Sequence, residues 1–119
     1  MIIDHMNLPV SDLAVSRLFY DAVLAPLGCV VVAEDGPAVG YGTTSWSFGI
    51  ELTGDAIVKL HVAFAAASRL QVDAFFAAAV GAGAMSNGDP GNRPQYGPDY
   101  YAAFVKDPDG HNIEAVYRG

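Results

Sequence analysis

The sequence predicts an α+β domain in which the order strand, helix, three strands occurs twice. Residues 2–10 and 57–65 alternate between apolar and polar side chains, as strands with one buried face do. Each is followed by a stretch with apolar residues at helical spacing that ends at glycines. Short strand-like runs separated by turn residues follow in each half. We therefore expect one domain over residues 1–119, with modules of about 1–54 and 55–119.

In the first module, alternation places His5 and Asn7 on one face of the opening strand and Leu8 and Val10 on the other. A polar residue before the apolar periodicity can cap the helix, and the Pro and Gly that follow end it. The predicted elements are a strand at 2–10, a helix from Ser11 or Asp12 to about Ala25, and strands at 29–34, 38–42 and 46–52.

In the second module, the helix should end at Gly81 and Gly83. Residues 87–99 are rich in Gly, Pro and polar residues, and we expect them to form an irregular loop. The last two strands are separated by the turn at 107–110. The predicted elements are a strand at 57–65, a helix from about Ser68 to Val80, and strands at 100–106 and 111–117.

The composition excludes several kinds of partner. The net charge is −7, and the six Lys and Arg residues are scattered along the chain. A nucleic-acid partner needs clustered basic residues, and an anionic membrane surface also attracts them. No apolar run reaches the roughly 18 residues that span a bilayer. The single cysteine, Cys29, is predicted to be a small buried hydrophobe. We expect a cytoplasmic protein that binds neither nucleic acid nor membranes.

Three segments resemble the vicinal-oxygen-chelate superfamily, which contains glyoxalases, bleomycin-resistance proteins and dioxygenases. They are Ile3–Leu13 with the following Phe19-Tyr20, Leu60–Phe64, and Phe104–Glu114 with its Asp-Pro-Asp-Gly turn. The resemblance covers essentially the whole chain. It implies two βαβββ modules that form a curved mixed sheet around a cleft, a small-molecule substrate or ligand, and a homodimer.

The resemblance also implies a divalent metal ion in the cleft. The positions that match its ligands are His5, His61 and Glu114, with Glu51 as a fourth candidate. Such a set suits Zn, Ni, Co, Mn or Fe(II). Without the family, a lone strand histidine is more often a hydrogen-bonded core residue, and Glu51 could be an exposed charge at a strand end. A carboxylate at Glu114, between apolar neighbours, needs a partner in either case. We expect His111 to face solvent.

The irregular stretch before the last two strands joins a cation to several tyrosines. Loops of this content often line ligand pockets, so Arg93, Tyr96, Tyr100 and Tyr101 are predicted to bind substrate. The alternative is an ordered surface loop in which Arg93 pairs with Asp89 or Asp99. Trp46 is predicted to lie in the core or a dimer interface, with substrate stacking as the alternative.

The leading functional hypothesis is a metal-dependent, glyoxalase-like lyase or isomerase that acts on a small substrate with vicinal oxygens. The metal would bind these oxygens, and Glu51 or Glu114 would be the catalytic base that accepts the adjacent proton. One alternative is a metal-free protein that binds or sequesters a small molecule such as an antibiotic. A second is an Fe(II) extradiol-type dioxygenase, for which two His and one Glu would suffice.

Overall fold

Two helices and eight strands make up the chain in a computed structural model that describes residues 2–119, and their order confirms the predicted repeat. The first module contains β1 (Met6–Val10), α1 (Leu13–Leu24), a 3₁₀ turn (Ala25–Leu27), β2 (Val30–Asp35), β3 (Ala38–Gly42) and β4 (Phe48–Leu52). The second contains β5 (His61–Ala65), α2 (Arg69–Gly81), β6 (Ser86–Asn92), β7 (Tyr101–Lys106) and β8 (Asn112–Tyr117).

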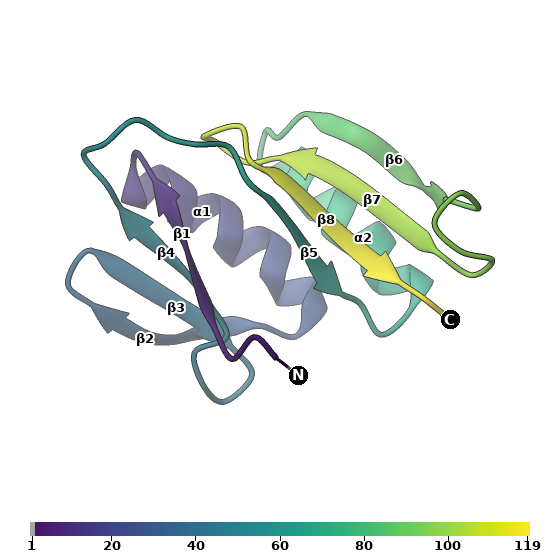
Figure 1. Cartoon of the computed structure of the whole chain (residues 1–119), viewed down its shortest axis with the longest axis horizontal. Coiled ribbons are helices and arrows are strands. Elements are labelled where there is room, and N and C mark those ends of the chain that lie inside the picture. The colour runs from purple at the N-terminus through teal and green to yellow at the C-terminus, as the bar shows by residue number, and fades with distance from the viewer. Residues whose placement is uncertain (1) are drawn as a thin grey trace.

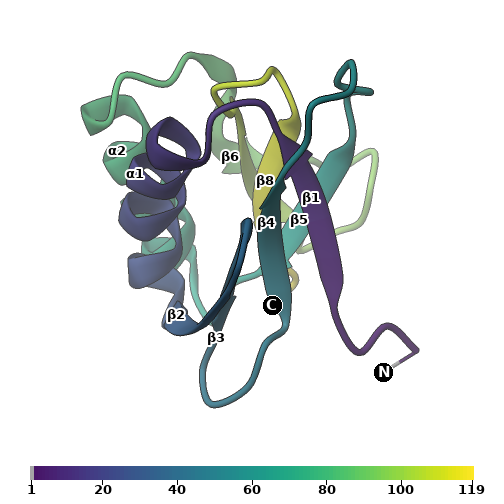
Figure 2. The ribbon, with the colours of Figure 1, turned by 90° about the vertical axis from the view of Figure 1, so that its left-hand side faces the viewer.

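Each module forms its own four-stranded sheet, and the two sheets have equivalent strand orders. These orders are β1-β4-β3-β2 and β5-β8-β7-β6. The first and last strands of each module pair in parallel, and the remaining neighbours are antiparallel. Both helices lie on the same side of the two sheets (Figures 1 and 2). The opposite face of each sheet is therefore left without a helical layer.

Side-chain caps begin both helices where the sequence predicts. The Asp12 carboxylate accepts a hydrogen bond from the Val15 amide (3.0 Å), and the Ser68 hydroxyl accepts one from the Gln71 amide (3.1 Å). Each cap satisfies an amide that has no partner within its helix. The first helix ends in the 3₁₀ turn, followed by Gly28 at φ 83°, a left-handed conformation that favours glycine.

β1 and β5 are shorter than the alternating stretches that predict them. They begin at Met6 and His61 rather than at residues 2 and 57. Each begins where its parallel partner begins, because Met6 lies opposite Phe48 and His61 lies opposite Asn112. Residues upstream have no neighbouring strand with which to pair. Alternation therefore predicts which face a residue occupies, whereas the partner strand sets the length of the ladder.

β6 corrects the prediction that residues 87–99 form an irregular loop. Ser86–Asn92 pairs with β7, with register shifts between Ser86 and Gly88 and between Gly88 and Gly91. β6 is an edge strand, where a proline such as Pro90 is tolerated because one side of the strand needs no donors. Gly and Pro thus mark a bulged edge strand here rather than the absence of a strand.

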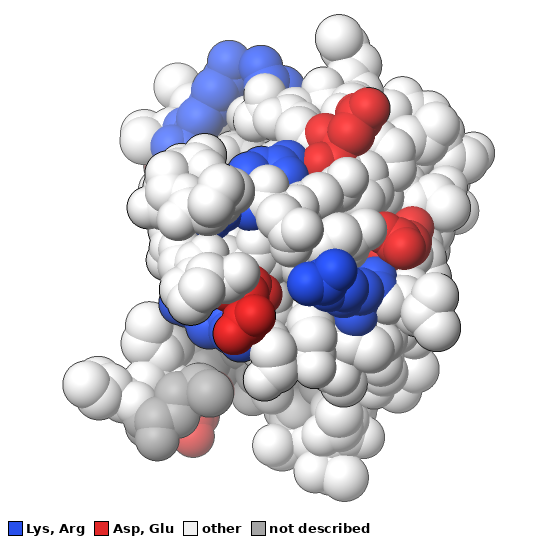
Figure 3. All heavy atoms as spheres, turned by 90° about the vertical axis from the view of Figure 1, so that its right-hand side faces the viewer, with Lys and Arg blue, Asp and Glu red and all other residues white. Residues whose placement is uncertain are grey.

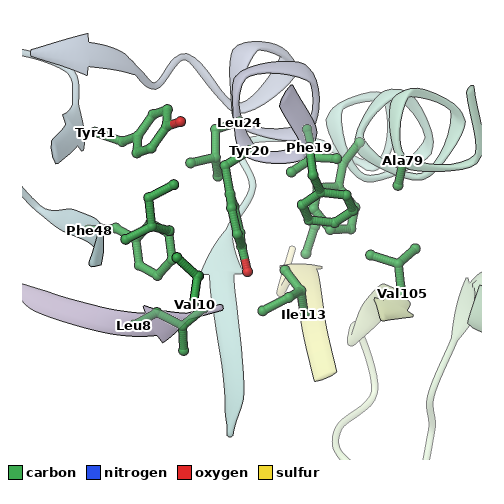
Figure 4. Packing of buried hydrophobic residues seen from close by; sticks show 14 of the residues in the cluster. Leu8, Val10, Phe19, Tyr20, Leu24, Tyr41, Phe48, Ala79, Val105 and Ile113 are labelled. Carbon is green, nitrogen blue, oxygen red and sulfur yellow. The ribbon is translucent and has the colours of Figure 1, made fainter. Parts of the chain in front are cut away.

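One hydrophobic core joins the two modules. Leu8 and Val10 of β1 are fully buried, as alternation predicts, together with Tyr20 of α1 and Phe75 of α2. Core residues from both modules converge between the helices and the sheets (Figure 4). The rings of Phe48 and Phe64, from different modules, meet edge to face with centroids 5.0 Å apart.

A buried carboxylate at the β7–β8 turn ties the modules together. The Asp107 side chain accepts hydrogen bonds from the Tyr20 hydroxyl (2.6 Å) and from the amides of Asp109 (3.0 Å) and His111 (2.8 Å). Burial, followed by the neighbouring Asp107 charge, raises the pKa of Tyr20 well above its ordinary value, so Tyr20 stays a donor. The turn is thereby fastened to α1 of the first module.

His111 is fully buried, which corrects the prediction that it faces solvent. Its Nδ1 accepts a hydrogen bond from the Leu60 amide (2.9 Å), and its Nε2 lies 2.9 Å from the Pro9 carbonyl oxygen. This pairing fixes the tautomer with the proton on Nε2. The turn directs His111 back into the seam between β1 and β5, a position that its polar sequence neighbours do not reveal.

The surface carries no block of positive charge on the face shown in Figure 3, where basic and acidic side chains are interspersed. No helix within residues 2–119 is long and apolar enough to cross a membrane.

Candidate metal site and ligand cleft

His61 and Glu114 meet on the helix-free face of the second sheet. The Nε2 atom of His61 lies 2.9 Å from Oε1 of Glu114, and the Tyr100 hydroxyl donates a hydrogen bond to Oε2 of the same carboxylate. The side chain of Glu114 is only 2% exposed, whereas that of His61 is 52% exposed. The partner that the sequence requires for this carboxylate is therefore a histidine on one oxygen and a tyrosine on the other.

Strand alternation explains why Glu114 faces this way. Its neighbours Ile113 and Ala115 belong to the core, so Glu114 points to the opposite side of β8. In the parallel β5–β8 pair, Glu114 lies opposite Ala63, two residues beyond the position of His61. The small side chain of Ala63 leaves room between the imidazole and the carboxylate.

The second module has a hollow of about 530 Å³ around this pair, which we call the module-2 hollow. Its lining consists of His61, Gln95, Tyr96, Tyr100, Phe104, Glu114 and Arg118. Burial and the hydrogen bond to Glu114 raise the pKa of Tyr100 to about 12, so its hydroxyl is a donor at neutral pH. The hollow combines an aromatic wall, a cation and a preassembled His–Glu pair.

The first module has a separate hollow of about 490 Å³, the module-1 hollow, lined by Asp4, His5, Asn7, Asp35, Ser45 and Trp46. His5 is 58% exposed, and its Nδ1 lies 2.7 Å from an Asp4 carboxylate oxygen. A carboxylate on one ring nitrogen orients a histidine and leaves the other nitrogen free, as in many metal-binding histidines.

The structure brings Glu51 against Asn7. The Asn7 amide donates a hydrogen bond to Glu51 Oε1 over 3.2 Å, and Glu51 is exposed at the end of β4. Glu51 lies opposite Pro9 in the β1–β4 pair. Its second oxygen accepts no hydrogen bond within residues 2–119.

Comparison of the modules distinguishes Glu51 from Glu114. His5 and His61 are equivalent, because each lies seven residues before a helix N-cap, Asp12 or Ser68. On β8, Glu114 lies two positions beyond the residue opposite His61. Its equivalent on β4 should therefore lie two positions beyond the residue that would be opposite His5. Met6, the residue after His5, lies opposite Phe48, so the equivalent of Glu114 in the first module is Gly49. Glu51 is therefore displaced along β4 by two residues from the place that Glu114 occupies on β8.

The side chain of Trp46 packs over Gly49, which has no side chain of its own. The indole Nε1 donates a hydrogen bond to Asn7 Oδ1 (2.9 Å), and the ring lies across Gly40 and Gly49. A Cβ atom at Gly40 would lie 2.1 Å from Trp46 Cδ2, and one at Gly49 would lie 2.6 Å from Nε1. Because the two glycines have no side chains, the indole can pack flat against the backbone there, and its ring forms a wall of the module-1 hollow.

We predict that Gly40→Ala will displace Trp46 and destabilise the fold by about 1–3 kcal/mol, because the new methyl group overlaps the ring. Trp46 is the chain's one tryptophan, so its fluorescence emission should shift to the red as the indole enters water. The matched control is Gly54→Ala, where a Cβ meets nothing within 4 Å. Unchanged emission in Gly40→Ala would show that the Trp46 ring does not pack against Gly40.

The predicted substrate-binding residues separate into two groups. Tyr96 and Tyr100 line the module-2 hollow. Tyr101 points toward the helical layer, where its hydroxyl donates to Asp73 of α2 (2.6 Å). Arg93 donates to the backbone carbonyls of Asp89 (2.7 Å) and Gly91 (2.8 Å) rather than to a side-chain carboxylate, and it lines a smaller neighbouring hollow.

Arg118, Gln95 and Phe104 also line the hollow, although they are not among the residues predicted from the sequence. Phe104 could have been found, because it lies opposite Glu114 and so shares its face. Arg118 follows the last strand and Gln95 lies in the β6–β7 connection, where no periodicity predicts direction. The metal ligands predicted from the resemblance form two separate groups in one chain, and no set of three His, Cys, Asp or Glu side chains suited to a metal assembles within residues 2–119.

The fold and these paired polar sites define a class of two-module cleft proteins, and comparison with known proteins identifies the family. The profile of the Glyoxalase/Bleomycin resistance protein/Dioxygenase superfamily matches residues 2–115, so the chain belongs to this superfamily. No curated protein sequence matches it significantly.

Solved structures show the same fold. A glyoxalase/bleomycin resistance protein from Albidiferax ferrireducens T118 is 32% identical, with a TM-score of 0.87 over 100% of both chains. A glyoxalase/bleomycin resistance protein/dioxygenase family enzyme from Burkholderia phytofirmans PsJN is 18% identical, with a TM-score of 0.74 over 98% of both chains. The oxidase ChaP-H2 is 24% identical, with a TM-score of 0.70 over 100% of this chain and 94% of that one. The last two similarities concern the fold alone.

Proposed function

We propose that this protein is a metal-dependent lyase or isomerase of the glyoxalase type, acting on a small substrate with two neighbouring oxygen atoms. The observation that carries the proposal is the His61–Glu114 pair. Nε2 of His61 and Oε1 of Glu114 lie 2.9 Å apart on neighbouring strands, so both atoms could be ligands of one divalent ion. Imidazole and carboxylate donors suit Zn, Ni, Co, Mn or Fe(II).

His5 would complete the ligand set from a second copy of the chain. Nε2 of His5 has no hydrogen-bond partner within residues 2–119, and Asp4 orients the ring through Nδ1, so His5 is suited to be a metal ligand. His5 nevertheless lies in a different hollow from His61. We therefore propose a homodimer in which the module-1 hollow of one chain faces the module-2 hollow of the other. Each cleft would then combine His5 from one chain with His61 and Glu114 from its partner.

Within this cleft, Glu51 is the better base of the two glutamates. Both oxygens of Glu114 are engaged, one by His61 and the other by Tyr100. Glu51 has one oxygen held by Asn7 and is exposed on the same face as His5. A bound divalent ion supplies Lewis acidity toward the two substrate oxygens, which acidifies the adjacent C–H bond. The free oxygen of Glu51 would accept that proton and return it to the neighbouring carbon.

The experiment that tests this proposal is α-proton exchange of hydroxyacetone in D₂O, followed by NMR. Protein loaded with Ni, Zn or Co should accelerate the exchange, and chelation should abolish it. Glu51→Gln should lose about 10²–10⁴-fold of the acceleration, the usual contribution of a general base, while retaining its metal. Loss of metal from Glu51→Gln would make Glu51 a ligand instead, and no acceleration by any loaded wild-type protein would refute the lyase or isomerase activity.

Two other functions have specific support. The aromatic wall of Tyr96, Tyr100 and Phe104 suits a protein that only binds a flat ligand, and a wild type that takes up no metal would favour it. A set of two His and one Glu also suits an Fe(II) dioxygenase, which oxygen-dependent cleavage of catechol would reveal. For each of these functions we propose a cytoplasmic location.

A further inference from the structure

We infer that Arg118 binds a carboxylate of the substrate, so that the proposed enzyme acts on small organic acids that also carry two neighbouring oxygens. This inference rests on the proposed function, because it concerns the same hollow. Arg118 is exposed and lines the module-2 hollow together with Gln95, Tyr96 and Tyr100. No acidic group forms an ion pair with it within residues 2–119.

The geometry links Arg118 directly to the His61–Glu114 pair. The Arg118 guanidinium lies over the Tyr100 ring, with Cζ 4.9 Å from the ring centroid. The hydroxyl of the same tyrosine donates to Glu114. Tyr100 therefore holds a cation on its ring and the candidate metal ligand on its hydroxyl. A ligand that reaches the His61–Glu114 pair also comes within reach of Arg118.

The other arginines of the chain are engaged differently. Arg17 pairs with Glu34 on the surface, and Arg93 donates to two backbone carbonyls. Arg69 lies over Tyr101, on the helical side of the second sheet. Neither these arginines nor Lys59 and Lys106 line the module-2 hollow, so Arg118 is the one Lys or Arg in its lining within residues 2–119. Within residues 2–119 only Arg17 of the six Lys and Arg residues pairs with a carboxylate, so Arg118 is distinguished by its position in this hollow and not by the lack of an ion pair.

The expected anion is a carboxylate rather than a phosphate. A guanidinium presents a planar fork that matches a carboxylate with two parallel hydrogen bonds, and stacking on Tyr100 keeps that fork flat and oriented. Gln95, in the same lining, adds an amide donor. A phosphate dianion would call for further basic side chains, and within residues 2–119 Arg118 is the only Lys or Arg that lines this hollow.

The test compares two chelating probes on metal-loaded protein by isothermal titration calorimetry. Succinic monohydroxamate and butyrohydroxamate both offer two neighbouring oxygens, but only the first carries a carboxylate at its other end. Wild-type protein should bind the carboxylate probe about tenfold more tightly, the lower end of the range for a hydrogen bond to a charged group. Arg118→Gln should remove this preference, and Arg118→Lys should retain part of it.

Arg69→Gln is the matched control, because it changes the net charge equally and should keep the full preference. If wild type binds both probes equally, or if Arg118→Gln keeps the preference, the inference is wrong while the metal site stands. If neither probe binds the loaded protein, the proposed function fails and the inference fails with it. Equal loss of preference in Arg69→Gln would mean that only long-range charge matters, which also overturns a direct contact with Arg118.

Discussion

Glu114→Gln is expected to abolish metal binding, lowering the affinity by more than about 100-fold. Removing a group that only supports a ligand already costs roughly 10–100-fold, so losing the ligand itself should cost more. Glutamine keeps the shape of the side chain and its hydrogen bond from Tyr100 but lacks the negative charge. The measurement is elemental analysis of protein purified without a histidine tag and reloaded with each candidate metal.

Asp73→Asn is the control for this experiment. It also removes one carboxylate, but Asp73 lies on α2 and is bonded to Tyr101 on the other side of the sheet. This variant should keep its metal. Equal metal content in wild type and Glu114→Gln would show that Glu114 is not a metal ligand. Equal losses of metal in Glu114→Gln and Asp73→Asn would indicate a nonspecific effect of charge.

Mixing two inactive variants tests whether the site is shared between chains. His5→Ala and Glu114→Gln should each bind no metal alone, since each lacks one ligand in every cleft. After unfolding and refolding together, mixed dimers should regain metal in one of their two clefts, because one pairing combines the intact halves. A site built within a single chain would not recover on mixing.

Asp107→Ala is expected to have the largest effect on stability, lowering the free energy of unfolding by about 3–5 kcal/mol. Asp107 is 5% exposed and accepts three hydrogen bonds, one of them from the fully buried Tyr20 hydroxyl. Alanine would leave these donors without a partner, and the Tyr20 hydroxyl and the His111 amide belong to fully buried residues that water does not reach. Such a loss is a large fraction of the 5–15 kcal/mol by which domains are usually stable.

Urea unfolding would measure this effect, with Asp55→Ala as the exposed control that should change stability by less than about 0.5 kcal/mol. Tyr20→Phe removes one of the three hydrogen bonds and should cost about 1.5–3 kcal/mol. In the double variant the two losses should not add, since they share that bond. An effect of Asp107→Ala no larger than that of Asp55→Ala would refute the role of the turn.

Local patterns made most of the fold predictable. The caps at Asp12 and Ser68 begin both helices, and alternation places Leu8 and Val10 in the core. The requirement that a carboxylate in an apolar strand has a partner anticipates the environment of Glu114. These predictions succeed because each depends on residues close together in the sequence.

The parts that could not be predicted depend on distant residues. His111 is buried because its ring fills the seam between β1 and β5, and β6 forms because β7 offers it an edge. Arg118 reaches the module-2 hollow through its place over Tyr100. The displacement of Glu51 relative to Glu114 depends on strand register, which the sequence of either strand alone does not contain.

The irregular pairing of the outermost strands bears on the tendency of this protein to aggregate. The register shifts lie between β2 and β3 and between β6 and β7, at the outer edge of each sheet, whereas the β1–β4 and β5–β8 ladders are regular. An outer edge with a regular row of free amides and carbonyls would serve as a template for strands of other molecules, and bulges and proline interrupt that row. The bulged edges should therefore protect the concentrated protein against amyloid-like, open-ended growth.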